Sequence, residues 1–505
     1  MKSHLHTGEW FLPGSDLLLP GGLRFEESTK LILLELYSDK YLDASPVIKV
    51  DPDRDKRYNS KNYNDDYAYK HGIIFGKGFE TVTLYDAHWN GTNELGGELY
   101  ELTYRIGFVF FGAHFSQFSE ACISTATFQF PYIGSWFDAE TSLFPLKRDK
   151  EDQVSNHPLA VPHRANALVP AHDNLELRFF DNIEKQSKEY GIHEERRFHK
   201  LIEFSYKQPV SFETILTDAS CFENLMEFCI GEPISKRIHQ ISVAKEFVLE
   251  NSIRHHYHYQ EQVVLPVWNH NLHNGKNIDS QGKHSHFMLV SRWSLQADEL
   301  DNLIWKWFNN KEFYPIYDFY IDSNNWLQKS DAMLSNVMFN NRFLNLIQGL
   351  EGFYKRMHVS AVNDQDEFEQ KKKEMLLLVK DPGVKKWLND NLSYKRKKYK
   401  SLDQKLQLLI EERKEILHTL FGEKNDILDF FPRYAVTVRN NLSHGIHTKT
   451  SHGSELHVFF KTGQLLLAIC ILGSLGIENI ADRIGKFYPF RDLIFDIRRS
   501  KLNFV

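Results

Sequence analysis

The spacing of apolar residues changes once along this chain, and that change limits the folds that it can form. Up to about residue 295, short apolar and aromatic runs are separated by turns rich in Gly, Asn, Asp and Pro. The run from Tyr100 to Ile106 alternates apolar and polar side chains, as a half-buried strand does. From Asp298 onward the apolar residues fall at helical spacing. The sequence therefore predicts an α+β chain with a β-rich front and an all-α rear.

We expect two domains. Residues 1–295 predict an antiparallel sandwich or barrel with a helix inserted near 211–230, and residues 296–505 predict a helical domain. The expected strands are GEWFLP, GLRFEES, KLILLELY, HGIIFGKG, ETVTLYD, ELYELTYRIGFVFFGAHF, ACISTATFQF, NLELRFF, HKLIEFSY, HQISVAKEFVL, EQVVLPVW and HFMLVSRW. The expected rear helices are Asp331 to Met357, Glu367 to Lys380, Tyr394 to Leu420, Pro432 to His444, Glu455 to Leu475 and Arg491 to Lys501.

Composition points to a cytoplasmic protein without a membrane anchor. The four cysteines form no CxxC pair, which is typical of reduced, buried residues. The N-terminal MKSHLHTGEW lacks the apolar core of a signal peptide. The most apolar stretch, Leu465 to Ile477, is shorter than the roughly 20 residues that span a bilayer, so we expect a buried helix.

Charge is distributed unevenly along the chain. The net charge is -6, but residues 331–505 carry +7 and the remainder carries -13. The densest basic run is YKRKKYK, with Lys395, Arg396, Lys397, Lys398 and Lys400 between tyrosines. Cations bind phosphates and aromatic rings stack on bases, so this run is a candidate RNA-binding surface. A solvated helix face explains it equally well.

Several common chemistries lack their motifs. The chain contains no GxxxxGK[ST], no GxSxG and no HExxH. Histidines are dense between His255 and His286, but no cysteine lies near them and their spacing fits no known zinc finger. We therefore interpret these histidines mainly as loop and strand residues, with a metal site as the alternative, and we expect no metal and no cofactor.

An arginine followed after four residues by a histidine occurs twice. Arg413 and His418 lie in a charged, leucine-rich amphipathic pattern, so we interpret them as helix surface. Arg439 and His444 enclose the polar residues Asn-Asn-Leu-Ser, and Gly445 follows where a helix would stop. Residues five apart on a helix do not share a face. These two side chains could still converge on one phosphate, or His444 could simply favour a helix C-terminus through the dipole.

The context of this second pair resembles a known family. Arg439-Asn440-x-x-x-His444 is similar to the RNxxxH motif of HEPN ribonucleases, and Phe343 to Met357 resembles the first core helix of the Apea-like HEPN group. At the front, GEWFLPG and HGIIFGKGFETVTLYDA resemble the N-terminal domain of ApeA-type proteins, which act in bacterial abortive infection against phage. The resemblance covers nearly the whole chain.

The resemblance implies an RNA endonuclease that is active as a homodimer through its helical domain. Arg439 and His444 would be catalytic, with Asn440 and Ser443 supporting them and Glu351 holding Arg439. The expected activity is metal-independent cleavage of tRNA or other structured RNA through the 2′-OH. The β-rich front would sense a phage-derived trigger and restrain this toxin-like activity. The alternatives are a catalytically inactive HEPN scaffold and a sensor that binds RNA or a partner protein.

Overall fold

A computed structural model of the chain describes most of its residues. The described ranges are 5–11, 16–26, 31–39, 72–78, 80–97, 99–115, 118–137, 168–188, 193–251, 262–269, 288–325, 336–358, 363–392, 400–422, 426–443 and 453–499. They fall into two compact units. The first contains residues 1–223 and 234–283, and the second contains residues 224–233 and 284–505.

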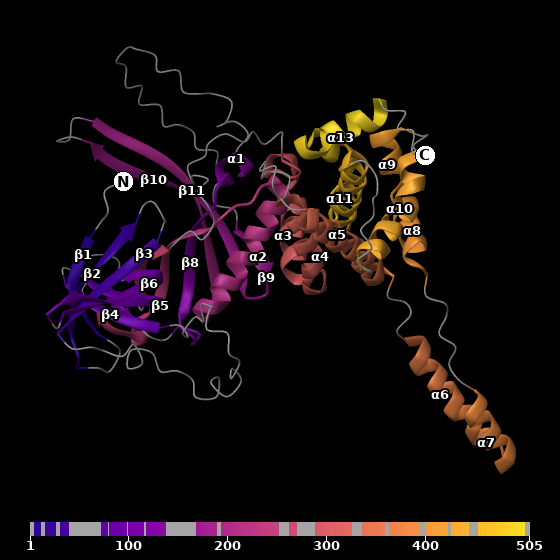
Figure 1. Cartoon of the computed structure of the whole chain (residues 1–505), viewed down its shortest axis with the longest axis horizontal. Coiled ribbons are helices and arrows are strands. Elements are labelled where there is room, and N and C mark those ends of the chain that lie inside the picture. Colours follow the sequence, from indigo (N-terminus) through magenta and orange to yellow (C-terminus); the bar gives the residue numbers. More distant parts are fainter. Residues whose placement is uncertain are drawn as a thin grey trace. The chain divides into compact units, whose positions relative to one another are not determined.

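The first unit begins with a six-stranded antiparallel barrel (Figure 1). Its strands are β1 (Leu5–Phe11), β2 (Leu19–Glu26), β3 (Leu31–Ser38), β4 (Gly72–Gly78), β5 (Thr81–Gly96) and β6 (Leu99–Phe111). The order is β3-β2-β1-β4-β5-β6, and β6 pairs back with β3, where Ile32 lies opposite Ile106. Leu102, Tyr104 and Ile106 are buried in the barrel core, as the alternation in the sequence predicts.

A second group of strands continues from the barrel. β14 (Gln262–Asn269) pairs with β6 and leads to β12 (Arg237–Ala244), β8 (Ile123–Gln129), β11 (His193–Val210), β10 (Leu175–Lys188) and β9 (Leu168–His172). The first part of α2 (Phe212–Ile230) packs on this sheet, because the Phe222 ring contacts Phe130, Phe179 and Phe204. The unit also contains α1 (Ile133–Phe137) and the strand pair β7 (Ala113–Phe115) and β13 (Val248–Asn251).

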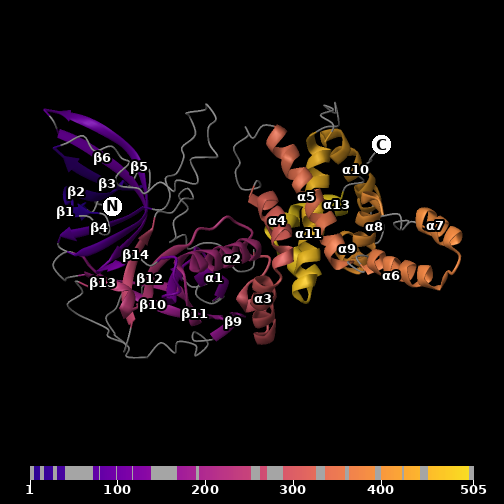
Figure 2. The same cartoon turned by 90° about the horizontal axis from the view of Figure 1, so that it is seen from below.

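The second unit is helical. Its helices are α3 (Ala297–Asn309), α4 (Tyr314–Asn325), α5 (Asn336–Met357), α6 (Asn363–Leu378), α7 (Pro382–Asn391), α8 (Leu402–Glu412), α9 (Lys414–Phe421), α10 (Asp426–Ser443), α11 (Gly453–Leu475), α12 (Ile480–Lys486) and α13 (Tyr488–Arg499). α11 runs through the middle, and every residue from 459 to 472 is buried (Figure 2). The predicted fold class, a barrel-like front followed by a helical rear, is confirmed.

α11 also has the composition of a membrane span. Within the described residues, Leu456–Leu475 is the one helical stretch long and apolar enough to cross a bilayer. In this structure 78% of that stretch is buried. The central helix of a helical core has the same properties, and this matches the buried helix that the sequence predicts here.

The structure differs from three sequence predictions. HFMLVSRW is not a strand in its described part: Met288 to Val290 is a buried bend, and a 3-10 turn follows because Ser294 Oγ donates to the Ser291 carbonyl (2.7 Å). The helix expected from Tyr394 to Leu420 breaks at Arg413 into α8 and α9, and residues 394–399 lie outside the described residues.

The third difference concerns α10. We expected Pro432 to be the first residue of this helix, yet α10 begins at Asp426 and Pro432 is buried inside it. A proline removes one backbone hydrogen bond from a helix interior. Here Pro432 lies on the same apolar stripe as Leu428 and Phe431, and burial of that stripe keeps the helix continuous.

Candidate active site

The site is built on three helices that pack closely. A Cβ added at Gly463 of α11 would lie 3.0 Å from Leu346 Cδ2 of α5 and 3.2 Å from Phe431 Cζ of α10. The glycine therefore lets α5 and α10 approach α11 at the same level. The Tyr434 ring of α10 also stacks on Phe459 of α11, with ring centroids 3.8 Å apart. These contacts fix α10 against α11.

The aromatic contacts also show which helix ends lie together. On α11, Gly463 lies beside Phe431 of α10, and Phe459, nearer the start of α11, stacks on Tyr434 of α10. The two helices therefore run in opposite directions. Gly463 also lies beside Leu346 of α5, and Phe460 lies near Phe343, which is closer to the start of α5. α5 and α11 therefore run in the same direction. The start of α5, the end of α10 and the start of α11 therefore share one end of the bundle, which we call the α10-terminal end.

The expected catalytic arginine lies at the α10-terminal end. Arg439 is in the last turns of α10 and is half-buried, whereas Asn440 and Ser443 are exposed. Among the residues that the structure describes, the guanidinium of Arg439 forms no hydrogen bond and no ion pair. Ser443 is the last residue of α10, and His444 lies outside the described residues. The structure thus gives the position of Arg439 and Asn440 but not that of His444.

Glu351 has partners other than the expected one. Its Oε1 accepts a hydrogen bond from Lys405 Nζ at 2.7 Å and forms an ion pair with Lys355 Nζ at 3.0 Å. Burial opposes ionisation of Glu351, but these hydrogen bonds outweigh it and lower the pKa of the carboxyl. Within the described residues no contact joins Glu351 to Arg439.

The positions of Glu351 and Arg439 along the helix bundle explain why they do not meet. Leu346 and Phe431 both lie beside Gly463, so they mark the same height in the bundle. Glu351 lies five residues from this height toward one end, and Arg439 lies eight residues from it toward the other end. At about 1.5 Å per residue, the two backbones lie roughly 20 Å apart along the bundle. Glu351 therefore ties α5 to α8 instead of holding Arg439, and the expected contact is replaced by this structural ion pair.

The basic run is only partly visible. Lys395, Arg396, Lys397 and Lys398 lie outside the described residues. Lys400 is exposed, and its Nζ lies 5.9 Å from the centroid of the Tyr354 ring. α8 runs parallel to α5, since Lys405 contacts Glu351 and Glu412 contacts His358 (2.9 Å). The start of α8 therefore faces the α10-terminal end.

The other arginine-histidine pair, Arg413 and His418, lies at helix ends. Arg413 separates α8 from α9 and pairs with Glu412 Oε2 at 3.3 Å. The backbone carbonyl of His418 accepts a hydrogen bond from the backbone N–H of Gly422, which closes the end of α9. Both residues thus lie in or beside α9, as the helical interpretation expects, and their lack of a catalytic role stays a prediction.

A metal centre is not evident in the part of the chain that the structure describes. No group of three or more His, Cys, Asp or Glu side chains occurs there with metal-binding geometry. The histidine-dense stretch between His255 and His286 lies almost wholly outside the described residues. Cys470 is fully buried, and burial raises the pKa of its thiol to about 12. A thiol of that kind stays protonated and is a poor nucleophile.

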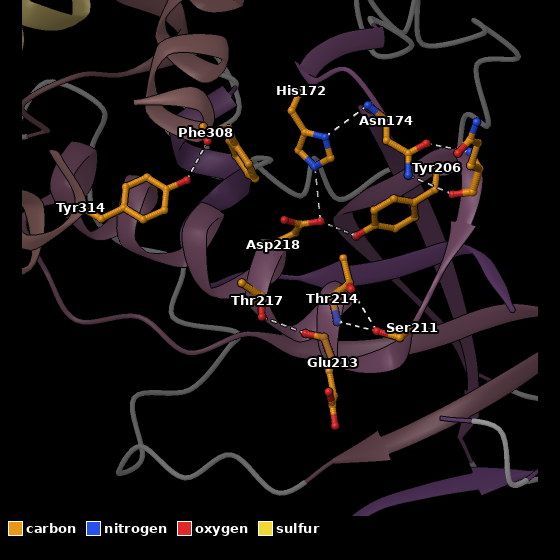
Figure 3. A network of polar contacts seen from close by, with 11 residues as sticks. His172, Asn174, Tyr206, Ser211, Glu213, Thr214, Thr217, Asp218, Phe308 and Tyr314 are labelled. Atoms are coloured by element: carbon orange, nitrogen blue, oxygen red, sulfur yellow. Dashed lines mark hydrogen bonds and ion pairs between the residues drawn. The ribbon is translucent and has the colours of Figure 1, made fainter. Parts of the chain in front are cut away.

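The first unit contains one His-Asp-Tyr network, shown in Figure 3. His172 Nε2 lies 3.4 Å from Asp218 Oδ2, which also accepts a hydrogen bond from the Tyr206 hydroxyl (3.1 Å). The backbone N–H of Asn174 donates to His172 Nδ1, so both ring nitrogens are engaged. An imidazole with both nitrogens occupied cannot serve as a general base without losing a bond. We interpret this network as a brace between α2 and the ends of β9 and β11.

Comparison with known families defines the class of the protein. Residues 344–480 match the family described as Apea-like HEPN, a range that includes α10, α11 and α5 from residue 344 onward. Proteins with this domain are generally ribonucleases. No curated protein and no solved structure matches the chain.

The front of the chain identifies the family more narrowly. Residues 5–291 match the ApeA N-terminal domain 1, and this match covers more than half of the chain. The chain belongs to the ApeA family. It has the two-domain arrangement of an ApeA-type defence protein with a C-terminal HEPN domain.

Proposed function

We propose that this protein is a metal-independent endoribonuclease that cleaves tRNA or other structured RNA during abortive infection. One observation carries the proposal. Arg439 and Asn440 lie at the exposed end of a core helix of the HEPN domain, and the motif continues to His444 immediately after that helix. Arg439 forms no polar contact with any other described residue, so its charge is available for a phosphate.

RNA supplies the nucleophile for this reaction. The 2′-OH attacks the adjacent phosphorus, a bond forms between the 2′-oxygen and phosphorus, and the bond from phosphorus to the 5′-oxygen breaks. One proton leaves the 2′-OH and another reaches the departing 5′-oxygen. The products are a 2′,3′-cyclic phosphate and a 5′-hydroxyl. His444 is suited to either proton transfer, because an imidazole has an ordinary pKa of about 6.5.

The other motif residues suit the phosphate itself. Arg439 presents a planar, positively charged fork of donors to the non-bridging oxygens, where negative charge builds up. Asn440 and Ser443 are exposed on the same helix end and would orient the phosphate or the imidazole. Lys395, Arg396, Lys397, Lys398 and Lys400 would bind the RNA backbone at a distance from the cleaved bond.

Two copies of the chain would complete the site. A single histidine cannot act as base and acid in the same step, whereas a two-fold dimer brings two motifs together. We place the dimer contact in the helical domain. The β-rich unit would respond to a phage-derived trigger, and the protein would act in the cytoplasm without a metal or cofactor.

Purified full-length protein incubated with total bacterial RNA tests this function. The expected result is a limited set of new RNA ends that sequencing can map, and Arg439→Ala should abolish them. If the wild-type protein binds RNA without cutting it, with or without phage infection of the source cells, the inactive scaffold becomes the correct reading.

A further inference from the structure

The helical unit contains a hairpin that has no core of its own. Its helices are α6 and α7, and Lys372 Nζ of α6 donates a hydrogen bond to the Asn389 carbonyl of α7 at 3.1 Å, so the two helices run antiparallel (Figure 2). The Asp381 carboxylate caps the start of α7. None of the residues from 368 to 392 is buried. Helices of this length depend on a buried apolar face for their stability, and this hairpin has none in that range.

The part of the hairpin next to its turn is apolar and exposed. Of the fifteen exposed large apolar side chains of the described chain, five lie in this one stretch of 13 residues. Single exposed apolar residues are ordinary, whereas a cluster of them marks an interaction surface. We call this stretch, residues 375–387, the hairpin tip. Its apolar residues are Met375 (50% exposed), Leu377 (80%), Leu378 (81%), Val384 (50%) and Trp387 (63%).

The apolar residues of α6 point in several directions. Successive residues of a helix are rotated by about 100°, so Met375 and Leu377 lie about 160° apart and Leu378 lies about 100° from Leu377. A helix that packs on one protein surface has its apolar residues in a single stripe. The end of α6 is apolar on several sides, and this arrangement suits immersion in an apolar layer.

Lysines surround the hairpin tip. Residues 371–391 include six lysines against the three acids Glu374, Asp381 and Asp390, which gives a net charge of +3. The surface that receives the tip must therefore be apolar inside and anionic outside. An anionic lipid bilayer has both properties, because phosphate headgroups cover its acyl chains. The lysines are Lys371, Lys372, Lys373, Lys380, Lys385 and Lys386.

Two other occupants fit the hairpin tip less well. A second copy of the tip would bring two sets of lysines together, and like charges repel. RNA would attract the lysines and a base could stack on Trp387, but Leu377 and Leu378 would gain nothing from the phosphate backbone. The two leucines are the most exposed apolar residues of the tip, so the occupant has to account for them.

We propose that the hairpin tip inserts into the surface of an anionic lipid bilayer. Leu377 and Leu378 enter the acyl region, Trp387 lies at the level of the headgroups, and the lysines contact lipid phosphates. α6 has 16 residues and α7 has 10, both fewer than the roughly 20 that span a bilayer, so the attachment is peripheral. It holds the protein at the cytoplasmic face of a membrane and does not depend on the proposed ribonuclease activity.

Flotation of the full-length protein with lipid vesicles tests the proposal. One set of vesicles is phosphatidylcholine alone, and the other is an equal mixture of phosphatidylcholine and the anionic phosphatidylglycerol. The wild-type protein should float with the mixed vesicles and much less with phosphatidylcholine alone. Added salt should weaken the binding, because it screens the attraction between the lysines and the lipid phosphates.

The critical variant carries Leu377→Ser and Leu378→Ser together. Both side chains are exposed, so the variant should fold as the wild-type protein does. Its partition into the mixed vesicles should fall at least about tenfold, since two apolar side chains no longer enter the acyl region. The matched control carries Leu17→Ser and Leu18→Ser, because these adjacent leucines are also exposed (51% and 47%) and lie outside the hairpin. The control should float as the wild-type protein does.

Two results would overturn the proposal. One is no flotation of the folded wild-type protein with the mixed vesicles, and the other is equal flotation of the two double variants. If the Leu377/Leu378 variant instead loses RNA binding or dimerisation while the wild-type protein ignores vesicles, the tip contacts RNA or a second copy. The ribonuclease proposal is tested separately, because Arg439→Ala should abolish RNA cleavage and still float.

Discussion

Arg439 differs from Arg483 and Arg498 of the helical core in what surrounds it. Arg483 donates to the Ser294 carbonyl and to the Glu478 carbonyl, and Arg498 donates to the carbonyls of Leu420 and Thr419. Both arginines donate to backbone carbonyls within the protein. Arg439 has no such partner among the described residues, and an arginine left in this state is suited to bind an external anion.

The first prediction compares the two arginine-histidine pairs. Arg439→Ala and His444→Ala should each lower the RNA cleavage rate by at least about a hundredfold, because each removes a group that acts on the reacting phosphate. Arg413→Ala and His418→Ala are the matched controls and should leave cleavage close to the wild-type rate. Cleavage assays on folded variants decide this. Loss of cleavage in Arg413→Ala or His418→Ala, with Arg439→Ala and His444→Ala still active, would mean that the site is wrongly chosen.

The second prediction concerns Lys461 on α11. This side chain is 9% exposed, and burial lowers the pKa of its amine to about 8, although the Asp492 carboxylate acts in the opposite direction. Between pH 8 and 10.5 the unfolded chain holds this proton and the native protein does not. The free energy of unfolding should therefore rise with pH across that window, by at most about 3 kcal/mol.

Lys461→Met isolates this effect. At pH 7 the variant should be more stable than the wild-type protein by about 1–2 kcal/mol, because no charge has to be buried. That advantage should shrink as the pH rises from 8 to 10.5. Lys486→Met, at a side chain that is 66% exposed, should show no such change. Denaturant unfolding at several pH values measures both, and a constant difference for Lys461→Met would refute the assignment.

At the scale of elements, close packing of α5, α10 and α11 holds the motif in place. Gly463 and Gly473 lie on the same helix, but only Gly463 has neighbours within 3.2 Å of an added Cβ. Replacing a helix-interior glycine with alanine normally stabilises by about 0.5–1 kcal/mol. The two positions therefore separate helix propensity from packing.

The third prediction uses this pair. Gly473→Ala should raise the free energy of unfolding by about 0.5–1 kcal/mol, and Gly463→Ala should gain less or lose stability, since Leu346 and Phe431 must move. Gly463→Val should be destabilised by about 1–3 kcal/mol. Chemical unfolding compares the three variants. Equal gains at the two glycines would show that α11 does not pack as described.

Much of the element pattern could be predicted from the sequence. The alternation from Tyr100 to Ile106 identifies β6. The helix expected near 211–230 is α2, and Ser211 Oγ accepts a hydrogen bond from the backbone N–H of Thr214 at its start. Such signals are local. They depend on side-chain spacing and on caps, and tertiary contacts do not have to be known.

The errors arose where distant contacts decide the outcome. Pro432 lies inside α10 because its apolar stripe is buried by other helices, and Met288 to Val290 is buried without forming a strand. The pairing of Glu351 with Lys405 could not be predicted either, because the two residues are 54 positions apart and no local sequence signal indicates the contact. The motif at Arg439 was found from the resemblance, since its spacing alone is expected about once by chance.

At the scale of the whole molecule, each of the two units matches a different domain family. The barrel and its adjoining sheet match the ApeA N-terminal domain, and the helical unit matches the Apea-like HEPN domain. The family is associated with defence, and its HEPN domain is generally a ribonuclease. The positive charge from residue 331 onward agrees with an anionic partner for the helical unit.

The fourth prediction concerns assembly. Because one His444 cannot supply both proton transfers at once, the active species should be a two-fold dimer through the helical domain. Light scattering under the conditions of the cleavage assay should give twice the 59.4 kDa mass of one chain. Mixing inactive Arg439→Ala with inactive His444→Ala should restore part of the activity if the two motifs share one cleft. An active monomer would contradict this arrangement.

The chemistry of the cut RNA tests the central claim most directly. Residues 434–450 contain no Asp, Glu or Cys, so this segment offers no ligands for the two-metal route, and the proposed mechanism uses the 2′-OH as nucleophile. Cleavage should therefore proceed in EDTA, and mass analysis of the upstream fragment should show a 2′,3′-cyclic phosphate. A substrate with one 2′-deoxyribose at the mapped scissile position should resist. Loss of cleavage in EDTA, or equal cleavage of the deoxy substrate, would contradict the account.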